Sequence, residues 1–254
     1  MSELDGVVAL VTGSSRGIGA AIARLFAEAG AAVAVHGRDR QSANAVQEQI
    51  TAAGGRAISV LADLTDPAQI EAARASIEDS LGPIDVLVAN AGGNPVRPGP
   101  LEELTPEGWQ ASIEANLTAT FLTVKAFLPG MKERRRGTII TMSSAAARRP
   151  TVHSPLAYAA AKAGIELFTK HVALQAGPFD IRVNCIAPET ILTETNRQQI
   201  PAQVQEQLIQ AHPVQRLGTP EDVADAALFL MRNPQVTGAV LEVSGGESLV
   251  EALT

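Results

Sequence analysis

The stretch TGSSRGIG, residues 12–19, lies between an apolar run, Val7–Thr12, and an alanine-rich segment, Gly19–Ala29. Glycine permits a tight turn and lets a ligand approach the backbone closely, and the first N–H groups of a helix attract an anion. A glycine-rich turn by itself is a weak signal. Because this one directly joins a strand-like run to a helix-like segment, it predicts a phosphate-binding turn at the end of the first strand.

Short β-branched runs alternate with longer alanine-rich segments along the chain. The runs are apolar nearly throughout, as expected of strands that are covered on both faces. We expect strands at Val7–Thr12, Ala32–His36, Ala57–Leu61, Val86–Asn90, Thr138–Met142, Arg182–Ile186 and Ala239–Val243. We expect helices at Gly19–Ala29, Gln41–Ala53, Pro67–Leu81, Thr105–Lys132, Ala157–Ala176 and Pro220–Met231. This alternation predicts an α/β fold, a single Rossmann-type doubly wound parallel sheet of about seven strands with helices on both faces.

The segment Glu189–Pro213 interrupts this alternation. It follows a strand, is rich in Gln and Thr, and carries one weak helical pattern, Pro201–Ala211. Ligands of open α/β sheets bind beyond the carboxyl ends of the strands, so we interpret the segment as a small substrate lid. The alternative is an ordinary surface excursion. No composition shift divides residues 1–254, which we interpret as one nucleotide-binding domain.

The composition limits the kinds of molecule that the protein is expected to bind. Lys and Arg number 20 and Asp and Glu 27, and a net charge of -7 argues against sequence-independent binding of nucleic acid. The acidic amino terminus lacks the signal-peptide pattern, and no apolar stretch has the ~18 residues of a membrane span. We therefore expect a cytoplasmic protein with no membrane partner. The one cysteine, Cys185, and four scattered histidines predict neither a disulfide nor a metal site.

The residues after the second expected strand bear on the choice of cofactor. An acid there accepts the ribose 2′-hydroxyl of NAD, whereas arginine suits the 2′-phosphate of NADP. Asp39 lies 20 residues beyond Gly19, a spacing that favours NAD. Arg38 comes earlier, however, and Arg16 in the turn could reach the same phosphate. We therefore favour NADP(H) over NAD(H); the alternative for Arg38 is solvated surface charge.

Tyr158 and Lys162 are four residues apart in an expected helix and therefore share one face. A nearby ammonium favours the phenolate and lowers the pKa of a tyrosine from ~10, so the pair can move a proton to or from a carbonyl oxygen. Ser144, just after the fifth expected strand, could hydrogen-bond that oxygen. No Gly-x-Ser-x-Gly elbow surrounds it, which argues against a serine hydrolase. Asn116 is a polar residue within an otherwise apolar helical stretch, which suggests that its side chain forms specific hydrogen bonds.

These motifs occur together and in a fixed order. They are TGSSRGIG (12–19), Asp63, ANAG (89–92), Asn116, Ser144, YAAAK (158–162), RVNCIAP (182–188) and Thr193. Together they closely resemble the short-chain dehydrogenase/reductase family over nearly the whole chain, from Val7 to Val243. The resemblance implies an NAD(P)-dependent enzyme that interconverts a carbonyl and a secondary alcohol. Within the family the chain looks most similar to 3-oxoacyl-carrier-protein reductases.

The resemblance also implies roles for single residues. Tyr158 would be the acid/base, Ser144 would orient the substrate carbonyl, Lys162 would bind the nicotinamide ribose and lower the pKa of the tyrosine, and Asn116 would hold a water of the proton relay. Cofactor contacts are implied for Gly13, Ser15, Arg16, Gly17, Ile18, Gly19, Arg38, Asp63, Leu64, Asn90, Ala91, Gly92, Tyr158, Lys162, Pro188, Ile191 and Thr193. A small-molecule substrate and a homotetramer built through two long helices, Glu107–Lys132 and Ala157–Ala176, are implied as well.

Two features depart from the family pattern. Glu189 stands where members usually have glycine, near the expected carboxamide site and lid entrance, and the loop Ala145–Leu156 is one residue longer than in many members. Two other functions remain alternatives. A sensor of nicotinamide nucleotides would not require the four catalytic residues, and a lyase or dehalogenase on this scaffold would not require Lys162 or the phosphate turn.

Overall fold

Seven parallel strands form one sheet in the structure, a computed structural model that describes residues 3–149, 154–246 and 249. Their order is β3-β2-β1-β4-β5-β6-β7. The strands are β1 (Val8–Val11), β2 (Ala32–Gly37), β3 (Arg56–Leu61), β4 (Val86–Ala89), β5 (Gly137–Met142), β6 (Ile181–Pro188) and β7 (Val240–Val243). Each expected strand is present, with bounds that differ by at most two residues. The predicted parallel sheet is therefore confirmed.

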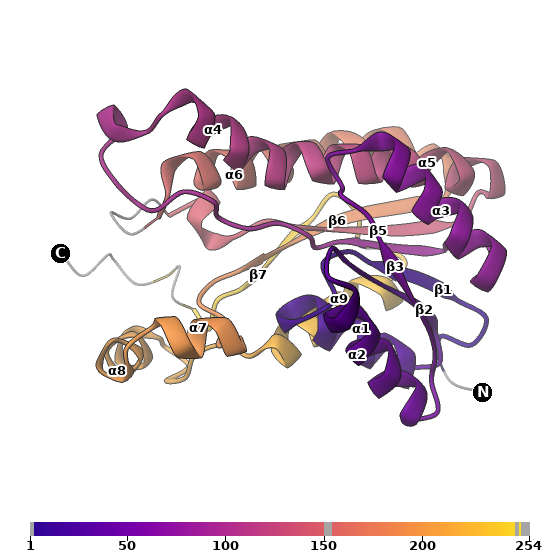
Figure 1. Ribbon diagram of the computed structural model, residues 1–254, viewed down its shortest axis with the longest axis horizontal. Helices are drawn as coiled ribbons and strands as arrows, with labels where there is room; N and C mark the ends of the chain where they lie inside the picture. Colours follow the sequence, from indigo (N-terminus) through magenta and orange to yellow (C-terminus); the bar gives the residue numbers. More distant parts are fainter. Residues whose placement is uncertain (1–2, 150–153, 247–248, 250–254) are drawn as a thin grey trace.

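Helices cover both faces of the sheet, as Figure 1 shows. One face is covered by α1 (Gly17–Glu28), α2 (Arg40–Ala52) and α9 (Pro220–Arg232). The other is covered by α3 (Pro67–Leu81), α5 (Ala119–Arg134) and α6 (Leu156–Ala176). Because both faces are covered, the strands carry apolar residues at successive positions rather than at alternate ones.

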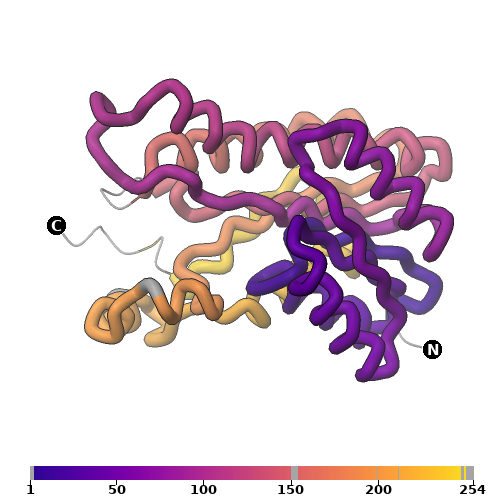
Figure 2. Tube along the Cα trace, in the orientation of Figure 1, coloured from indigo at the N-terminus to yellow at the C-terminus, as the bar shows by residue number. Residues whose placement is uncertain are grey.

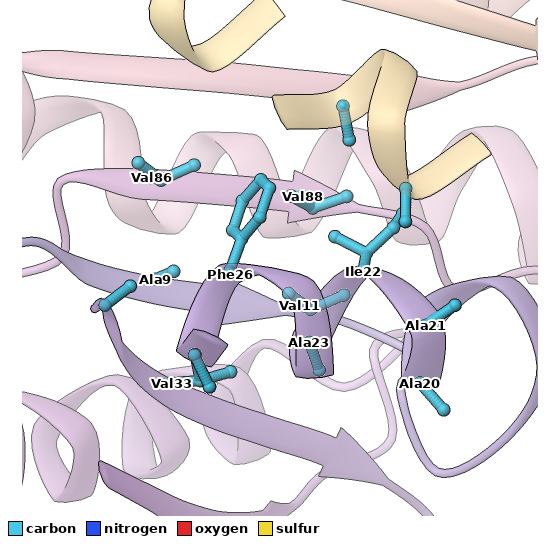
Figure 3. Close-up of a cluster of buried hydrophobic side chains, with 14 of the residues drawn as sticks. Ala9, Val11, Ala20, Ala21, Ile22, Ala23, Phe26, Val33, Val86 and Val88 are labelled. Carbon is cyan, nitrogen blue, oxygen red and sulfur yellow. The ribbon is translucent and has the colours of Figure 1, made fainter. Parts of the chain in front are cut away.

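The packing of α1 on the sheet illustrates how one face of the core forms. Ile22 and Phe26 are four residues apart on α1 and both are fully buried. Figure 3 shows the Phe26 ring pointing from α1 toward Val86 and Val88 of β4. Full burial of such a side chain stabilises the fold by up to ~3 kcal/mol. This packing holds α1 against the centre of the sheet, and the glycine-rich turn lies at the amino end of the same helix.

The expected helix Thr105–Lys132 is wrong as a single regular helix. The structure has α4 (Pro106–Ile113), a π-helical turn at Glu114–Thr118 and then α5. A π-turn inserts an extra residue into the helical ladder and often marks a functional position. Apolar periodicity reports which face of a helix is buried, but it does not report a single inserted residue, so the sequence pattern missed the turn.

The segment after β6 contains two short helices. These are α7 (Glu194–Gln199), which was not expected, and α8 (Ala202–Ala211), which agrees with the expected Pro201–Ala211. Figure 2 shows this segment, in orange, at the same end of the molecule as the loop between β4 and α4. A bridge between Ile191 and Gly218 ties its beginning to the chain that leads into α9.

The strand order reverses between β1 and β4. The chain passes from β1 outward to β2 and β3, and then returns to β4 on the other side of β1. In open α/β sheets, ligands bind beyond the carboxyl ends of the strands at this point. The glycine-rich turn follows β1 and therefore lies there. Within the described ranges, no helix combines the length and apolarity needed to cross a membrane.

Candidate active site

The turn after β1 leaves no room for side chains at two of its glycines. A Cβ on Gly13 would lie 2.9 Å from the Cα atom of Ala91, and the φ of Gly13 is +62°. A Cβ on Gly19 would lie 2.4 Å from the carbonyl oxygen of Gly13 and 2.6 Å from Nδ2 of Asn90. The backbone of the turn thus packs directly against the end of β4, and only glycine permits this close approach.

The amino end of α1 is open to an anion. Arg16 is the N-cap residue, its side chain makes no capping hydrogen bond, and the first turn contains no acid. The first N–H groups of the helix therefore lack a side-chain acceptor, and the helix dipole favours negative charge there. Ser15, Gly17 and Ile18 belong to the same loop and first turn. Together these residues fit a phosphate group.

Residues at the end of β4 hold this turn. Asn90 Nδ2 donates to the carbonyl oxygens of Thr12 (2.9 Å) and Gly13 (3.2 Å). The N–H of Ala91 donates to Thr12 Oγ1 at 3.0 Å, and that hydroxyl donates to the carbonyl oxygen of Val88 at 3.2 Å. Two of the expected cofactor residues, Asn90 and Ala91, therefore also fix the shape of the turn.

His36 is a functional candidate that the sequence pattern did not indicate. The N–H of Gly13 donates to its Nδ1 at 3.0 Å, and its Nε2 lies 3.1 Å from the carbonyl oxygen of Ala62. Since the first contact requires an acceptor and the second a donor, the ring is neutral with its proton on Nε2. Burial lowers the pKa of His36 below its ordinary value of 6.5. His36 thus braces the glycine turn against the end of β3.

The two charged side chains directly after β2, Arg38 and Asp39, have different surroundings. Arg38 is exposed, and it is close enough to Asp63 to lower the pKa of that carboxyl as a minor cause, after hydrogen bonds from Thr65. Asp39 is the N-cap residue of α2, and its Oδ1 accepts from the N–H (2.8 Å) and the hydroxyl (2.5 Å) of Ser42. The Asp39 carboxylate, whose distance from Gly19 in the sequence favoured NAD, therefore caps α2.

Asn116 lies in the π-turn and is completely buried. Its Nδ2 donates to the carbonyl oxygens of Gly93 (2.7 Å) and Ser112 (2.8 Å), and its Oδ1 accepts from the N–H of Gly93 at 3.2 Å. A Cβ on Gly92 would lie 2.7 Å from Asn116 Oδ1 and 3.3 Å from Lys162 Nζ. The structure therefore brings the loop after β4, Asn116 and Lys162 together.

Lys162 and Tyr158 lie on α6 beside this loop. Lys162 is buried, and its Nζ donates to the carbonyl oxygen of Met142 at 2.9 Å and lies 5.5 Å from the centroid of the Tyr158 ring. Burial lowers the pKa of Lys162 from 10.5 to about 8. Burial raises the pKa of Tyr158 above 10.0, opposed by a hydrogen bond with the Ser144 side chain. The sequence predicts that the ammonium lowers the pKa of the phenol; in the structure the direction is the opposite, and desolvation of the phenol is the largest cause.

Ser144 is in extended backbone after β5, with φ -160° and ψ 155°, and its hydroxyl accepts from the N–H of Ala146 at 3.3 Å. The preceding residue, Ser143, is buried. Its hydroxyl lies 3.0 Å from the carbonyl oxygen of Lys162 and 3.0 Å from Glu166 Oε1. Ser144 therefore carries the hydroxyl on the Tyr158 side, and Ser143 joins the end of β5 to α6.

The remaining expected residues lie around the same edge of the sheet. Thr193 caps α7, and its Cγ2 would lie 3.4 Å from a Cβ on Gly17, so the segment after β6 begins against the glycine turn. Pro188, Ile191 and Leu64 are buried. Glu189 is partly buried and its N–H donates to the carbonyl oxygen of Val243 at 3.1 Å.

Among the described residues, no three His, Cys, Asp or Glu side chains are grouped so that they could hold a metal ion. Cys185 is buried, and burial raises the pKa of its thiol. The loop from 145 to 156, expected to be longer than usual, is described only in part, because residues 150–153 lie outside the described ranges. The arrangement could serve proton transfer by Tyr158, Lys162 and Ser144 beside a turn whose geometry fits a phosphate group.

Residues 13–248 match a family model described as enoyl-(acyl carrier protein) reductase. The chain is 37% identical over 244 residues to the (2S)-[(R)-hydroxy(phenyl)methyl]succinyl-CoA dehydrogenase subunit BbsD of Thauera aromatica, covering 95% of this chain and 96% of that protein. It is 35% identical over 246 residues to the 7alpha-hydroxysteroid dehydrogenase of Escherichia coli strain K12, covering 96% and 95%.

Solved structures share the fold. A 3-oxoacyl-[acyl-carrier protein] reductase with bound NAD from Brucella melitensis superimposes with a TM-score of 0.87 and 36% identity, covering 96% of this chain and 93% of that one. A gluconate 5-dehydrogenase from Burkholderia cenocepacia, in complex with NADP and tartrate, gives a TM-score of 0.90 and 33% identity, covering 98% of both chains. Similar proteins thus bind either nicotinamide cofactor.

Proposed function

The chain belongs to the short-chain dehydrogenase/reductase family and is an oxidoreductase acting on alcohol and carbonyl groups, and from this premise we propose that it uses NADP(H), with Tyr158 as general acid and base. The observation that best supports this proposal is the position of Tyr158. Its ring lies beside Lys162, its hydroxyl is hydrogen-bonded to the Ser144 side chain, and Asn116 lies next to Lys162 across Gly92. These groups come from three different elements, and each can assist proton transfer at the Tyr158 hydroxyl.

Each of these residues has a distinct task in the proposal. Tyr158, whose pKa is raised by burial, is protonated at neutral pH and can donate its proton to a substrate carbonyl oxygen. Ser144 hydrogen-bonds the same oxygen as negative charge develops on it. Lys162 stabilises the phenolate that remains and binds the nicotinamide ribose. Asn116 holds the loop after β4 in place and, with Lys162, a water through which the proton is replaced.

The preference for NADP(H) rests on charge. Arg16 and Arg38 are exposed, one in the glycine turn and one just after β2, and Asp39 is engaged in capping α2. Two guanidinium groups suit a 2′-phosphate, whereas NAD requires an acceptor for its 2′-hydroxyl. When bound, the nicotinamide supplies or accepts the hydride.

We also propose the other cofactor contacts that membership of the family implies. The turn residues Gly13, Ser15, Gly17, Ile18 and Gly19 would hold the pyrophosphate, and Asp63, Leu64, Asn90, Ala91, Gly92, Pro188, Ile191 and Thr193 would line the rest of the cofactor site. Residues 189–213 would act as the substrate lid of a single domain spanning residues 1–254. Contact between Thr193 and the turn supports this, since a lid that begins at the cofactor can order when the cofactor binds.

For the substrate we propose a small carbonyl or alcohol compound, with 3-oxoacyl thioesters as the first class to test. The support is resemblance to proteins that bear such names, while other relatives are named as steroid and sugar dehydrogenases. Glu189 distinguishes this chain within that range, because a carboxylate near the lid entrance disfavours anionic groups there.

We further propose a homotetramer in the cytoplasm. Phe121 on α5 and Leu167 and Leu174 on α6 are large apolar side chains that are exposed in the single chain, Leu174 by 77%. Covering them in a subunit interface would remove this surface from water. Light scattering coupled to size exclusion tests the assembly: a mass near four times 26.4 kDa supports it, and a monomer contradicts it.

The function is tested with purified protein, NADPH or NADH, and a panel of ketones, 3-oxoacyl thioesters and 7-oxosteroids. We expect oxidation of the nicotinamide by at least one ketone, with kcat/KM higher for NADPH. Tyr158→Phe should remove turnover while NADPH still binds, as measured by fluorescence titration. Full activity of that variant would overturn the acid/base role. Tight NADPH binding without turnover on every substrate would favour a nucleotide sensor instead.

A further inference from the structure

Arg148, just beyond the Ser144 turn, connects three elements at the end of the sheet. Its Nε donates to Glu166 Oε2 on α6 at 3.0 Å, and its Nη1 donates to Glu242 on β7. The Glu166 side chain is only 13% exposed and that of Arg148 33%. Arg148 thus forms ion pairs within the protein, with two carboxylates from segments that lie far apart in the sequence.

The Glu166 carboxylate forms hydrogen bonds with one residue before Ser144 in the sequence and with one residue after it. Ser143, one residue before Ser144, lies with its hydroxyl 3.0 Å from Glu166 Oε1, and Arg148, four residues after it, binds Oε2. The N–H of Ser143 also donates to the carbonyl oxygen of Ile186 at 2.8 Å. The backbone on either side of Ser144 is therefore tied to one side chain of α6.

Glu166 belongs to a row of residues along α6. Tyr158, Lys162 and Glu166 follow one another at intervals of four, which places them along one side of the helix. A loop anchored at Glu166 is therefore held at a set position along the helix that also carries Tyr158 and Lys162.

We propose that Arg148 and Glu166 are positioning residues that hold Ser144 in register with Tyr158; the proposal rests on the carbonyl–alcohol chemistry proposed above. Ser144 itself makes few direct contacts. Its backbone is extended, and it leads into the short 3-10 turn at Ala145–Ala147. Without the ion pairs, that turn would keep its local hydrogen bonds and its packing on α6, but Arg148 would no longer tie it to Glu166. Displacement of a catalytic group by about 1 Å can cost about a hundredfold in rate.

Arginine suits this task better than lysine. Its planar guanidinium donates in several fixed directions and can bind two carboxylates at once, whereas a lysine ammonium acts as a flexible point charge. In Arg148 the Nε and Nη1 groups serve the two different partners. Arg148→Lys should therefore retain the charge yet restore only part of the positioning.

A double-mutant cycle with Ser144 tests whether Arg148 acts through that residue. In the otherwise natural protein, we expect Arg148→Met to lower kcat about tenfold and to leave the KM for NADPH within about twofold. In the Ser144→Ala background, the same change should lower kcat by less than about twofold, since nothing remains to be positioned. An equal loss in both backgrounds, or no loss in either, would overturn the proposal.

Arg74 provides a matched control. It also bridges two carboxylates, Glu71 and Glu78, its side chain is 29% exposed, and it lies on α3, away from the site. We expect Arg74→Met to leave kcat within about twofold in both backgrounds. A loss of kcat similar to that of Arg148→Met would show that removal of any bridging arginine suffices, and would contradict the proposal.

Amide hydrogen exchange tests the same inference without turnover. Exchange of the N–H groups of Ala146, Ala147 and Arg148 should be faster in Arg148→Met and Glu166→Gln than in the natural protein, and intermediate in Arg148→Lys. Unchanged exchange in all three variants would overturn the positioning role. If the natural protein turns over no carbonyl substrate, the proposed function fails, and this measurement still decides whether the loop is held.

Discussion

The Nζ atom of Lys162 lies 5.5 Å from the centroid of the Tyr158 ring and donates a hydrogen bond to the carbonyl oxygen of Met142. Burial moves both groups toward their neutral forms: the pKa of Lys162 falls to about 8, and the pKa of Tyr158 rises above 10.0. A protonated phenol at neutral pH is an acid ready to serve carbonyl reduction, while alcohol oxidation requires its conjugate base.

The two directions of the reaction should therefore depend on pH in opposite ways. Because the pKa of Tyr158 is raised, the phenol stays protonated through the neutral range. We expect kcat for ketone reduction to be level from pH 6 to pH 7 and to fall above pH 7, because Lys162, with a pKa of about 8, loses the charge that stabilises the phenolate. Oxidation should rise in the alkaline range as the phenolate forms. Initial rates across that range check this, and a reduction rate that falls between pH 6 and pH 7 would contradict the assignment.

Arg38 should select the cofactor. In the proposed function its removal would take away a charged partner of the 2′-phosphate, and a charge-assisted hydrogen bond contributes about 1.5–3 kcal/mol. Arg38→Ala should raise the KM for NADPH by about tenfold or more and change the KM for NADH by less than about twofold. Arg40→Ala, an exposed arginine at the start of α2, is the control and should leave both values unchanged. Equal effects on the two cofactors would exclude a specific phosphate contact.

Gly19→Ala should damage the phosphate turn. The added Cβ would lie 2.4 Å from the carbonyl oxygen of Gly13, so the turn or α1 must shift, at a cost of about 1–3 kcal/mol in unfolding free energy. We expect NADPH binding to weaken strongly in a fluorescence titration. Gly177→Ala is the matched control, since a Cβ there meets nothing within 4 Å. Normal affinity in Gly19→Ala would mean that the backbone does not approach the cofactor.

His36 should make stability depend on pH. Its pKa in the folded protein lies below the ordinary value of 6.5, so the unfolded chain binds the proton more readily. Stability is therefore retained above about pH 6.5 and lost as the pH falls below it. His36→Gln can supply an acceptor and a donor but does not titrate, so its thermal midpoint should fall less between pH 7 and pH 5. Parallel curves for the two proteins would show that His36 is not the titrating group.

Much of the fold follows from local pattern. Strands covered on both faces are apolar at successive positions, so each expected strand matched the structure within two residues. The same principle did not reveal the π-turn at Glu114–Thr118, because one inserted residue hardly disturbs apolar periodicity. Asn116 nonetheless stood out, since a polar residue within an apolar helix requires hydrogen-bond partners.

By itself, the sequence determined the sheet, the phosphate turn after β1 and the identity of the polar residues that could act together. Only the tertiary structure decided what surrounds them. It placed His36 against Gly13 and Arg148 between Glu166 and Glu242, and it engaged the Asp39 carboxylate in capping α2. It also reversed the expected direction of the pKa shift of Tyr158. The reason is physical: contacts between residues 18 to 94 positions apart depend on strand order, and a pKa depends on how completely folding removes a group from water.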